Sequence, residues 1–326
     1  MDIFSSLNPQ QVEAVKTTEG PLLILAGAGS GKTRVITVRI AYLITEKQVA
    51  PHNILAVTFT NKAAGEMRGR VEELLKGQKL QSAPLISTFH SLCVRVLRQD
   101  IEKLEEGYKK SFTIYDTDDS QKVVKMCLKD LGLDEKQNNP RNVRSAISAA
   151  KNRGEDAEMY ASKVESGDGK KAAIAKIFKM YDERLNLANA LDFDDLLIKT
   201  VKLLRKSPET REKYNDRYKY ILVDEYQDTN ALQFALISFL TEKQQNICVV
   251  GDDAQSIYGF RQADIRNILG FEEHFPDAKV ILLEQNYRST QTILDVAHAI
   301  IENNIHQKKN IRSPPGLAVH SFFFFW

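Results

Sequence analysis

The strongest constraint on the fold is a glycine-rich segment between an apolar run and a helix-forming sequence. The apolar run spans residues 22–25, and the segment after it reads Ala26-Gly27-Ala28-Gly29-Ser30-Gly31-Lys32-Thr33. Glycines let the backbone curl so that successive N–H groups face one centre, and the following helix N-terminus adds partial positive charge. The pattern predicts a loop that binds nucleotide phosphates, with Lys32 on the β- and γ-phosphates and the Thr33 hydroxyl on Mg²⁺. The alternative is a strand–helix turn without a ligand.

Ala26 stands where the strict phosphate-loop pattern has glycine. This position closes the predicted strand, so its methyl group need not touch phosphate. We therefore keep residues 26–33, with Ala26 included, as the predicted phosphate-binding loop.

Apolar runs alternate with helical patterns in the first and last thirds of the chain. The six runs lie at residues 22–25, 54–58, 85–87, 220–223, 247–250 and 279–283. In the first third, the helical patterns begin at Lys32, near Lys62 and near His90. Strands that alternate with helices predict a parallel sheet with helices on both faces.

Between residues 111 and 190 the strand signals fade. Helical apolar spacing appears instead in residues 120–131, 143–152 and 171–187. The simplest interpretation is one α/β domain, made of residues 1–110 and 191–286, with an all-helical insertion at 111–190. Three consecutive domains are the alternative, but the first would then have too few strands to cover its helices. Residues 287–326 would begin a further domain, with a helix at 290–303.

Composition narrows the class of protein. With 43% hydrophobic and 27% charged residues, the chain matches a globular protein rather than a disordered one. The net charge of +2 gives no general argument for nucleic-acid binding, so that case depends on local features. The three cysteines are far apart, which favours neither a zinc site nor a disulfide framework. Without a secretory signal or a membrane-length apolar run, we expect a cytoplasmic protein.

Two acids follow the apolar run at 220–223. Asp224 and Glu225 would stand at the carboxyl edge of the sheet, where the phosphate loop also lies. Asp224 suits the metal, and Glu225 suits the orientation and deprotonation of an attacking water. The alternative is that these acids cap the helix that begins near Ala231, a role that suits Asp228.

Several further segments separate this chain from kinases, GTPases and transporters. In chain order they are residues 7–11 (LNPQQ), 58–64 (TFTNKAA), 87–91 (STFHS), 191–196 (LDFDDL), 224–228 (DEYQD), 251–258 (GDDAQSIY) and 285–290 (QNYRST). Together they resemble the successive motifs of superfamily 1 DNA helicases of the UvrD/Rep/PcrA family, and most of all the PcrA type. The resemblance covers roughly residues 5–312 and implies a RecA-like P-loop NTPase domain.

The resemblance implies further roles at the nucleotide. Gln11 would read the adenine, and Arg34 and Tyr287 would flank the base. Gln255 would lie near the γ-phosphate, and Arg288 would act on it as an arginine finger from the side of the second domain. The expected cofactors are ATP and Mg²⁺, and the expected catalytic residues are Lys32, Glu225, Gln255 and Arg288.

The resemblance also implies contacts with DNA. Bases would stack on Phe59, Phe193, Tyr258 and Phe260, and the DNA backbone would meet Thr60, Asn61 and His90. Stacking tolerates any base sequence, as a translocating motor requires. The alternative for Phe59, Phe193 and also Phe89 is that they are core aromatics. The chain departs from the family at residues 260–262, Phe-Arg-Gln, where the family usually has Trp-Arg-Gly.

We therefore predict an ATP-dependent 3′–5′ DNA helicase or single-stranded DNA translocase, with ATP hydrolysis driving the motion. Single-stranded DNA and 3′-tailed duplex are the expected substrates, and repair or replication proteins the expected partners. The oligomeric state stays open. Five aromatic residues end the chain at 322–326, which suggests a truncated motor that unwinds poorly or not at all alone. The rival interpretations are a P-loop kinase or small-molecule NTPase, and a non-catalytic nucleotide- or DNA-binding fragment.

Overall fold

The computed structural model describes residues 3–301, apart from the side chains of Phe260, Arg261, His298 and Ile301. The predicted aromatic tail therefore lies outside the described residues. The chain forms two compact units. The first combines the residues up to Thr88 with residues 214–229 and those from Leu240 onward, and the second combines Phe89–Lys213 with Asn230–Phe239.

The first unit is built on a six-stranded sheet. Its strands are β1 (Leu22–Ala26), β2 (Ile54–Thr58), β3 (Leu85–Thr88), β6 (Tyr220–Val223), β7 (Ile247–Gly251) and β8 (Lys279–Leu283). The order is β3-β2-β6-β7-β1-β8, and every neighbouring pair is parallel. All six strands predicted from the apolar runs are confirmed.

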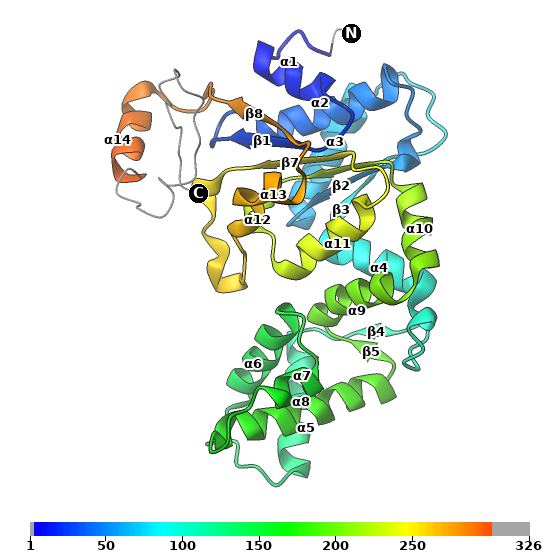
Figure 1. Ribbon diagram of the computed structural model, residues 1–326, viewed down its shortest axis with the longest axis vertical. Coiled ribbons are helices and arrows are strands. Elements are labelled where there is room, and N and C mark those ends of the chain that lie inside the picture. Colours follow the sequence, from blue (N-terminus) through cyan, green and yellow to red (C-terminus); the bar gives the residue numbers. More distant parts are fainter. Residues whose placement is uncertain (1–2, 302–326) are drawn as a thin grey trace. The chain divides into compact units, whose positions relative to one another are not determined.

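Helices cover both faces of this sheet, as predicted. Figure 1 shows α2 and α3 on one face and α12 and α13 on the other. The helices of this unit are α1 (Pro9–Lys16), α2 (Lys32–Thr45), α3 (Asn61–Leu74), α12 (Arg266–Leu269), α13 (Phe271–His274) and α14 (Gln291–Ile301). The core on the first face joins buried residues of α1, α2 and α3 to residues of β1, β2 and β8. On the other face, Tyr226 packs edge-on against Phe271, which also contacts Phe275.

The second unit is mostly helical. Its helices are α4 (Phe89–Asp100), α5 (Thr117–Asp130), α6 (Pro140–Asn152), α7 (Ala157–Ser162), α8 (Gly169–Leu187) and α9 (Phe193–Lys206), and the unit boundaries fall within α10 (Pro208–Arg217) and α11 (Ala231–Thr241). The predicted insertion is not wholly helical. The short strands β4 (Thr113–Ile114) and β5 (Ala190–Leu191) pair in parallel.

The compact units divide the chain at other residues than the predicted domains. Helices α4 and α9 pack against each other, and both belong to the second unit. The sequence prediction places both helices in the α/β domain, within residues 1–110 and 191–286. The core of the helical part itself joins buried residues of α5, α6, α7 and α8, among them Leu128, Ile147 and Phe178. A division into compact units does not test the predicted domain boundaries, at residues 110, 190 and 286, which stay a prediction.

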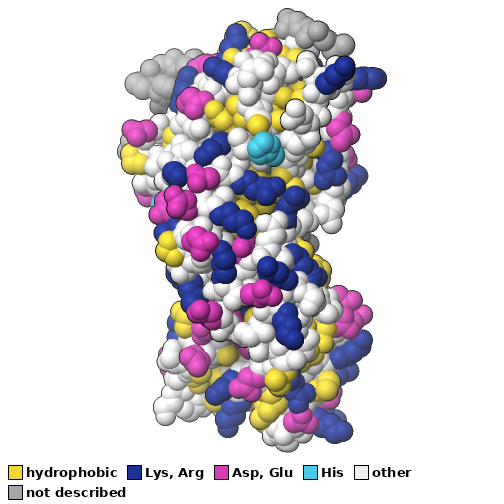
Figure 2. All heavy atoms as spheres, turned by 90° about the vertical axis from the view of Figure 1, so that its right-hand side faces the viewer, with side chains coloured by type: hydrophobic (Ala, Val, Ile, Leu, Met, Phe, Trp, Pro, Cys, Tyr) yellow, Lys and Arg dark blue, Asp and Glu magenta, His cyan; other side chains and the backbone are white. Residues whose placement is uncertain are grey.

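Within residues 3–301, no helix is both long and apolar enough to span a bilayer. Figure 2 shows one face of the molecule, on which Lys and Arg side chains are interspersed with Asp and Glu. Among the ion pairs of the second unit are Lys206 with Glu105 and Lys213 with Asp100.

Candidate nucleotide site and DNA-facing residues

The predicted phosphate loop connects β1 to α2. Ala26 is the last residue of β1 and packs in the core at 3% exposure, so its methyl group faces away from the loop's open side. Lys32 is the first residue of α2. Four consecutive loop carbonyls accept hydrogen bonds: Gly27 O from Ser30 Oγ (2.6 Å), Ala28 O from Asn286 Nδ2 (2.6 Å), Gly29 O from Tyr287 N (2.9 Å) and Ser30 O from Gln11 Nε2 (2.8 Å). One of these hydrogen bonds lies within the loop, and the other three come from Gln11, Asn286 and Tyr287, which therefore help to set the loop conformation.

Two loop positions require glycine. Gly29 has φ +75° and Gly31 has φ +88°, a region that other L-residues rarely adopt. A Cβ on Gly29 would lie 2.7 Å from Arg288 Cβ, and one on Gly31 would lie 2.8 Å from Gln11 Nε2. Each glycine thus allows a positive φ and leaves room for a neighbouring side chain, that of Arg288 at Gly29 and that of Gln11 at Gly31.

Two of the predicted catalytic groups, Lys32 and Glu225, come together at the carboxyl end of β6. Lys32 is buried, with its Nζ 3.9 Å from Glu225 Oε2. Glu225 itself has φ +52°, a strained conformation of the kind that occurs at functional sites. Gln227 donates from Nε2 to Glu225 Oε2 (2.9 Å) and accepts from the backbone N–H of Asp252 (3.1 Å). Gln227 therefore ties the predicted base to the end of β7.

Burial shapes the electrostatics of this edge. It raises the pKa of Asp224 to about 7, helped by the negative charge of Glu225, while Lys32 and a hydrogen bond from Thr33 oppose the shift. Burial likewise raises the pKa of Asp228 to about 7 and that of Asp252 to about 6. Protonation of these groups is favoured because ionised carboxylates here lack water.

A divalent cation would fit between Thr33 and Asp224. Hydroxyl and carboxylate oxygens are the ligands that Mg²⁺ prefers, with water and substrate phosphates completing its shell. A cation beside Asp224 would also favour the ionised carboxylate. Among residues 3–301, no group of three or more His, Cys, Asp and Glu side chains is arranged to hold a metal ion.

The remaining predicted nucleotide residues surround the loop. Gln11 is buried at 1% exposure in the capping box of α1, Arg34 is exposed on the first turn of α2, and Tyr287 is 55% exposed. Gln255 donates to a carboxylate oxygen of Asp252, beside the acids. The alternative that the acids at 224–228 cap α11 is wrong. Asn230 caps this helix instead: its Oδ1 accepts from Gln233 N, and its backbone N–H donates to Gln233 Oε1.

In the first unit, the predicted DNA contacts lie at strand ends. Thr60 is exposed and caps α3, its Oγ1 accepting from Ala63 N (3.1 Å). Asn61 is exposed on the same turn, and Phe59 is half-buried. Tyr258 is 36% exposed. The predicted stacking side chain of Phe260 lies outside the described residues.

In the second unit, Phe193 is 51% exposed on the first turn of α9. His90 lies against it, with the two ring centroids 6.1 Å apart in an edge arrangement. Burial lowers the pKa of His90, so a neutral ring is favoured near neutral pH. Phe89, by contrast, is 1% exposed and belongs to the core. Of Phe89 and Phe193, only Phe193 is exposed enough for a base to stack on its ring.

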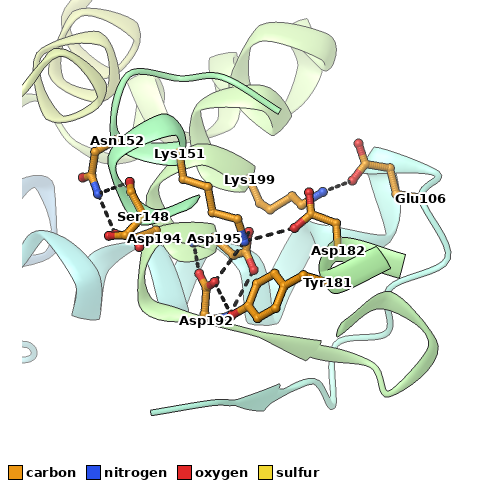
Figure 3. Close-up of polar contacts among 10 residues, drawn as sticks. All are labelled: Glu106, Ser148, Lys151, Asn152, Tyr181, Asp182, Asp192, Asp194, Asp195 and Lys199. Atoms are coloured by element: carbon orange, nitrogen blue, oxygen red, sulfur yellow. Dashed lines mark hydrogen bonds and ion pairs between the residues drawn. The ribbon is translucent and has the colours of Figure 1, made fainter. Parts of the chain in front are cut away.

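A cluster of charged and polar side chains lies at the start of α9, as Figure 3 shows. Asp192, directly before Phe193, caps α9 in a capping box with Asp195. Lys151 reaches Asp195 (2.7 Å) and Asp192 (2.9 Å), and Asn152 donates to Asp194 (2.7 Å). The start of α9 is therefore fixed by side chains of α6.

Most of this chain is similar to known proteins. The model of the UvrD/REP helicase N-terminal domain matches residues 7–276. The chain belongs to the UvrD/REP helicase family. It is 53% identical over 310 residues to the ATP-dependent DNA helicase PcrA of Bacillus subtilis, covering 95% of this chain and 41% of that protein. The PcrA helicases of Staphylococcus epidermidis and Staphylococcus aureus are 51% and 50% identical over 94% of this chain, and again 41% of each relative is covered. The chain thus spans about two fifths of the length of these curated relatives.

The departure from the UvrD/REP helicase pattern has a local cost. Gln262, where the family usually has glycine, adopts φ +63° at the end of a short 3₁₀ turn, Tyr258–Arg261. Its N–H donates to Gly259 O (2.9 Å), so the turn is kept. A left-handed conformation costs a residue with a side chain about 1–2 kcal/mol.

Sequence reasoning missed the residues that hold the others in place. Gln227 and Asn286 lie inside the quoted motifs, but no local pattern indicated their partners. Lys151 lies outside those motifs at the end of a helical pattern, where a lysine usually faces water. In each case the role depends on a contact with a distant segment, which no local sequence pattern shows.

Proposed function

We propose that this chain is the ATP-binding motor portion of an ATP-dependent 3′–5′ DNA helicase or single-stranded DNA translocase. The observation that carries the proposal is the convergence of Lys32, Asp224, Glu225 and Gln255 on one sheet edge beside a phosphate loop. The family match supports a DNA-linked motor over a small-molecule kinase.

The residues divide the hydrolysis chemistry among them. Lys32 neutralises the β- and γ-phosphates, and Glu225, held by Gln227, orients and deprotonates the attacking water. Gln255 and Arg288 act at the γ-phosphate, where arginine fingers contribute about 10³–10⁵-fold in rate in other phosphoryl-transfer enzymes. Mg²⁺, bound by Thr33 and Asp224, would neutralise phosphate charge. Adenine recognition falls to Gln11, Arg34 and Tyr287.

DNA binding is the second part of the proposal. Exposed Phe193 and Tyr258 offer stacking faces, and Thr60, Asn61 and His90 supply polar contacts to the strand. Exposed aromatic rings with polar contacts to the backbone bind single-stranded DNA without sequence preference. The substrates proposed are single-stranded and 3′-tailed duplex DNA, the setting is the cytoplasm, and the partners are proteins of repair or replication. Residues 1–110 with 191–286, 111–190 and 287–326 are the proposed domains.

The test combines nucleotide binding with single-turnover hydrolysis, which detects slow reactions. We expect Mg²⁺-dependent binding of a fluorescent ATP analogue, and phosphate release that rises with oligo-dT and equally with mixed-sequence DNA. Lys32→Ala should weaken binding at least about tenfold, whereas Glu225→Gln should retain binding and lose about 10²–10⁴-fold in turnover. Lys47→Ala, at an exposed position two residues after the end of α2, is the matched control.

The rivals give different results in the same assays. Phosphate transfer to a sugar or nucleoside without DNA stimulation would identify a kinase. Binding without any turnover in the wild-type chain would identify a non-catalytic fragment. Equal nucleotide binding by wild type and Lys32→Ala would remove the basis for the phosphate-loop assignment.

A further inference from the structure

The segment that follows β8 is bound to the back of the phosphate loop. Asn286 Nδ2 donates to Ala28 O (2.6 Å), and the backbone N–H of Tyr287 donates to Gly29 O (2.9 Å). A Cβ on Gly29 would lie 2.7 Å from Arg288 Cβ and 2.9 Å from Asn286 Nδ2. The segment thus packs directly on the loop backbone, at a position where any loop side chain would push it away.

Asn286 also holds the turn that carries Arg288. Its Oδ1 accepts from the backbone N–H groups of Arg288 (2.8 Å) and Ser289 (2.8 Å). An asparagine side chain has a donor and an acceptor on one planar group, so one amide can hold two backbone segments at once. Here the NH₂ holds the phosphate loop and the oxygen holds the arginine's backbone.

A second anchor supports the segment from the other side. Asn8, the N-cap of α1, donates to Tyr287 Oη (2.9 Å), which in turn donates to Gln285 Oε1 (3.0 Å). The residues on both sides of Asn286 are therefore tied to fixed elements. The Arg288 side chain itself is exposed. Its backbone is fixed beside the loop while its guanidinium remains available to a ligand.

We infer that Asn286 is a positioning residue that sets the distance between Arg288 and the phosphate loop. It thereby lets the arginine distinguish a nucleotide with a γ-phosphate from one without. An arginine on an unsupported segment would have to be ordered at each binding event, which weakens its interaction with the phosphate. This inference rests on the proposed function, because it takes the γ-phosphate as the target of Arg288.

The experiment is a binding cycle that needs no turnover. Affinities for ADP and for a non-hydrolysable ATP analogue, both with Mg²⁺, are measured by calorimetry. The proteins are wild type, Asn286→Ala, Arg288→Ala, the double variant, and Asn138→Ala as a distant control. We expect each single variant to lower the preference for the ATP analogue over ADP about tenfold, the size of a lost charge-assisted contact. The double variant should lose no more than the larger single one, because both act through one contact.

Asn286→Ser is the second variant, chosen to preserve the turn. A serine hydroxyl can still accept from the turn N–H groups but is too short to reach Ala28 O. It should behave like Asn286→Ala if the loop contact is required. Circular dichroism and ADP affinity within about threefold of wild type show that the variants fold and that the loop still binds.

The contrary outcomes separate the positioning role of Asn286 from the action of Arg288 on the γ-phosphate. Losses that multiply in the double variant, equal losses of ADP and analogue binding, or wild-type behaviour of Asn286→Ser would overturn the positioning role. If Arg288→Ala left the preference unchanged, the proposed action of Arg288 on the γ-phosphate would fail, and this inference with it. Failure of the DNA-stimulated hydrolysis would count only against the proposed function, because the binding cycle would still be readable.

Discussion

Replacement of Lys151 by methionine tests how the helical unit is held together. Lys151 is 2% exposed, and its Nζ lies 2.7 Å from Asp195, 2.9 Å from Asp192 and 3.2 Å from Asp182 (Figure 3). Tyr181 adds a hydrogen bond to Asp192 (2.8 Å). Methionine keeps most of the side-chain volume, so Lys151→Met removes the charge with little loss of packing.

The expected loss is about 3–5 kcal/mol of unfolding free energy near neutral pH. That is the typical cost of removing one partner from a buried ion pair, because the other partner stays buried and uncompensated. Asp192 and Asp195 are 10% and 4% exposed, so neither can be solvated in place. Asp182 is 36% exposed and adds less. Lys171→Met is the matched control: Lys171 is 57% exposed beside Asp168, and such surface pairs are worth about 0–1 kcal/mol.

The loss should depend on pH with a definite sign. Burial, and then the charge of Asp192, already raise the pKa of Asp195 to about 7. In Lys151→Met, we expect the pKa of Asp192 and of Asp195 to lie above the unfolded value, because burial still raises both while the cation that lowers them is gone. A group with a raised pKa stabilises the fold at low pH, and that contribution is lost as pH rises through the folded pKa. The gap between wild type and Lys151→Met should therefore be widest above about pH 7 and narrow toward about pH 5.

Equilibrium urea unfolding, followed by far-ultraviolet circular dichroism at several pH values, measures this gap. The reasoning fails if Lys151→Met costs less than about 1 kcal/mol near neutral pH, the range of an exposed pair. It also fails if the gap widens on acidification, since protonation would then not relieve the buried carboxylates.

Three further predictions concern other residues. Hydrogen bonds, first from Arg153 and then from Lys163, lower the pKa of Glu155 to about 2. Glu155→Gln should therefore cost about 1 kcal/mol in urea unfolding above about pH 4.5, and this cost should shrink as pH falls toward 2; a cost that stays constant between these pH values would contradict this. Phe193→Ala should weaken single-stranded DNA binding by about 1–3 kcal/mol in fluorescence titrations, with Phe193→Tyr close to wild type; equal affinities for all three proteins would exclude stacking there. Gln262→Gly should raise stability by about 0.5–1 kcal/mol, since the left-handed turn suits glycine, and a lower melting temperature would speak against strain.

The strands and the phosphate loop could be predicted because their signals are local. A strand of a parallel sheet with both faces covered is a nearly continuous apolar run, and all five residues of β2 and of β7 are buried. The loop combines glycines that need positive φ with a lysine that begins a helix. The acids after β6 followed from strand polarity, because parallel strands bring their carboxyl ends to one edge.

The unit boundaries and the small sheet could not be predicted in this way. Strands β4 and β5 have two residues each, too few to show a period of two. Helix α9 packs against α4 across a separation of about a hundred residues in sequence. A local pattern shows that a helix has an apolar face, but it does not show which distant helix covers that face.

The residues that the sequence did not reveal share one physical property: each is a polar group satisfied by a distant segment. Asn286 and Ala28 are 258 positions apart, and Lys151 and Asp195 are 44 apart. A buried donor without its acceptor costs about 1–3 kcal/mol, so such contacts are strongly specified, but their specification is three-dimensional. Residues that would contact the nucleotide, such as Lys32, Asp224 and Glu225, can be recognised from their residue type and local sequence motif. The residues that hold them in position cannot be recognised in this way, although catalysis by preorganised charges depends on both groups of residues. We therefore expect that a conservative substitution of Gln227 or Asn286 damages the nucleotide site, even though every residue that contacts the nucleotide is left unchanged.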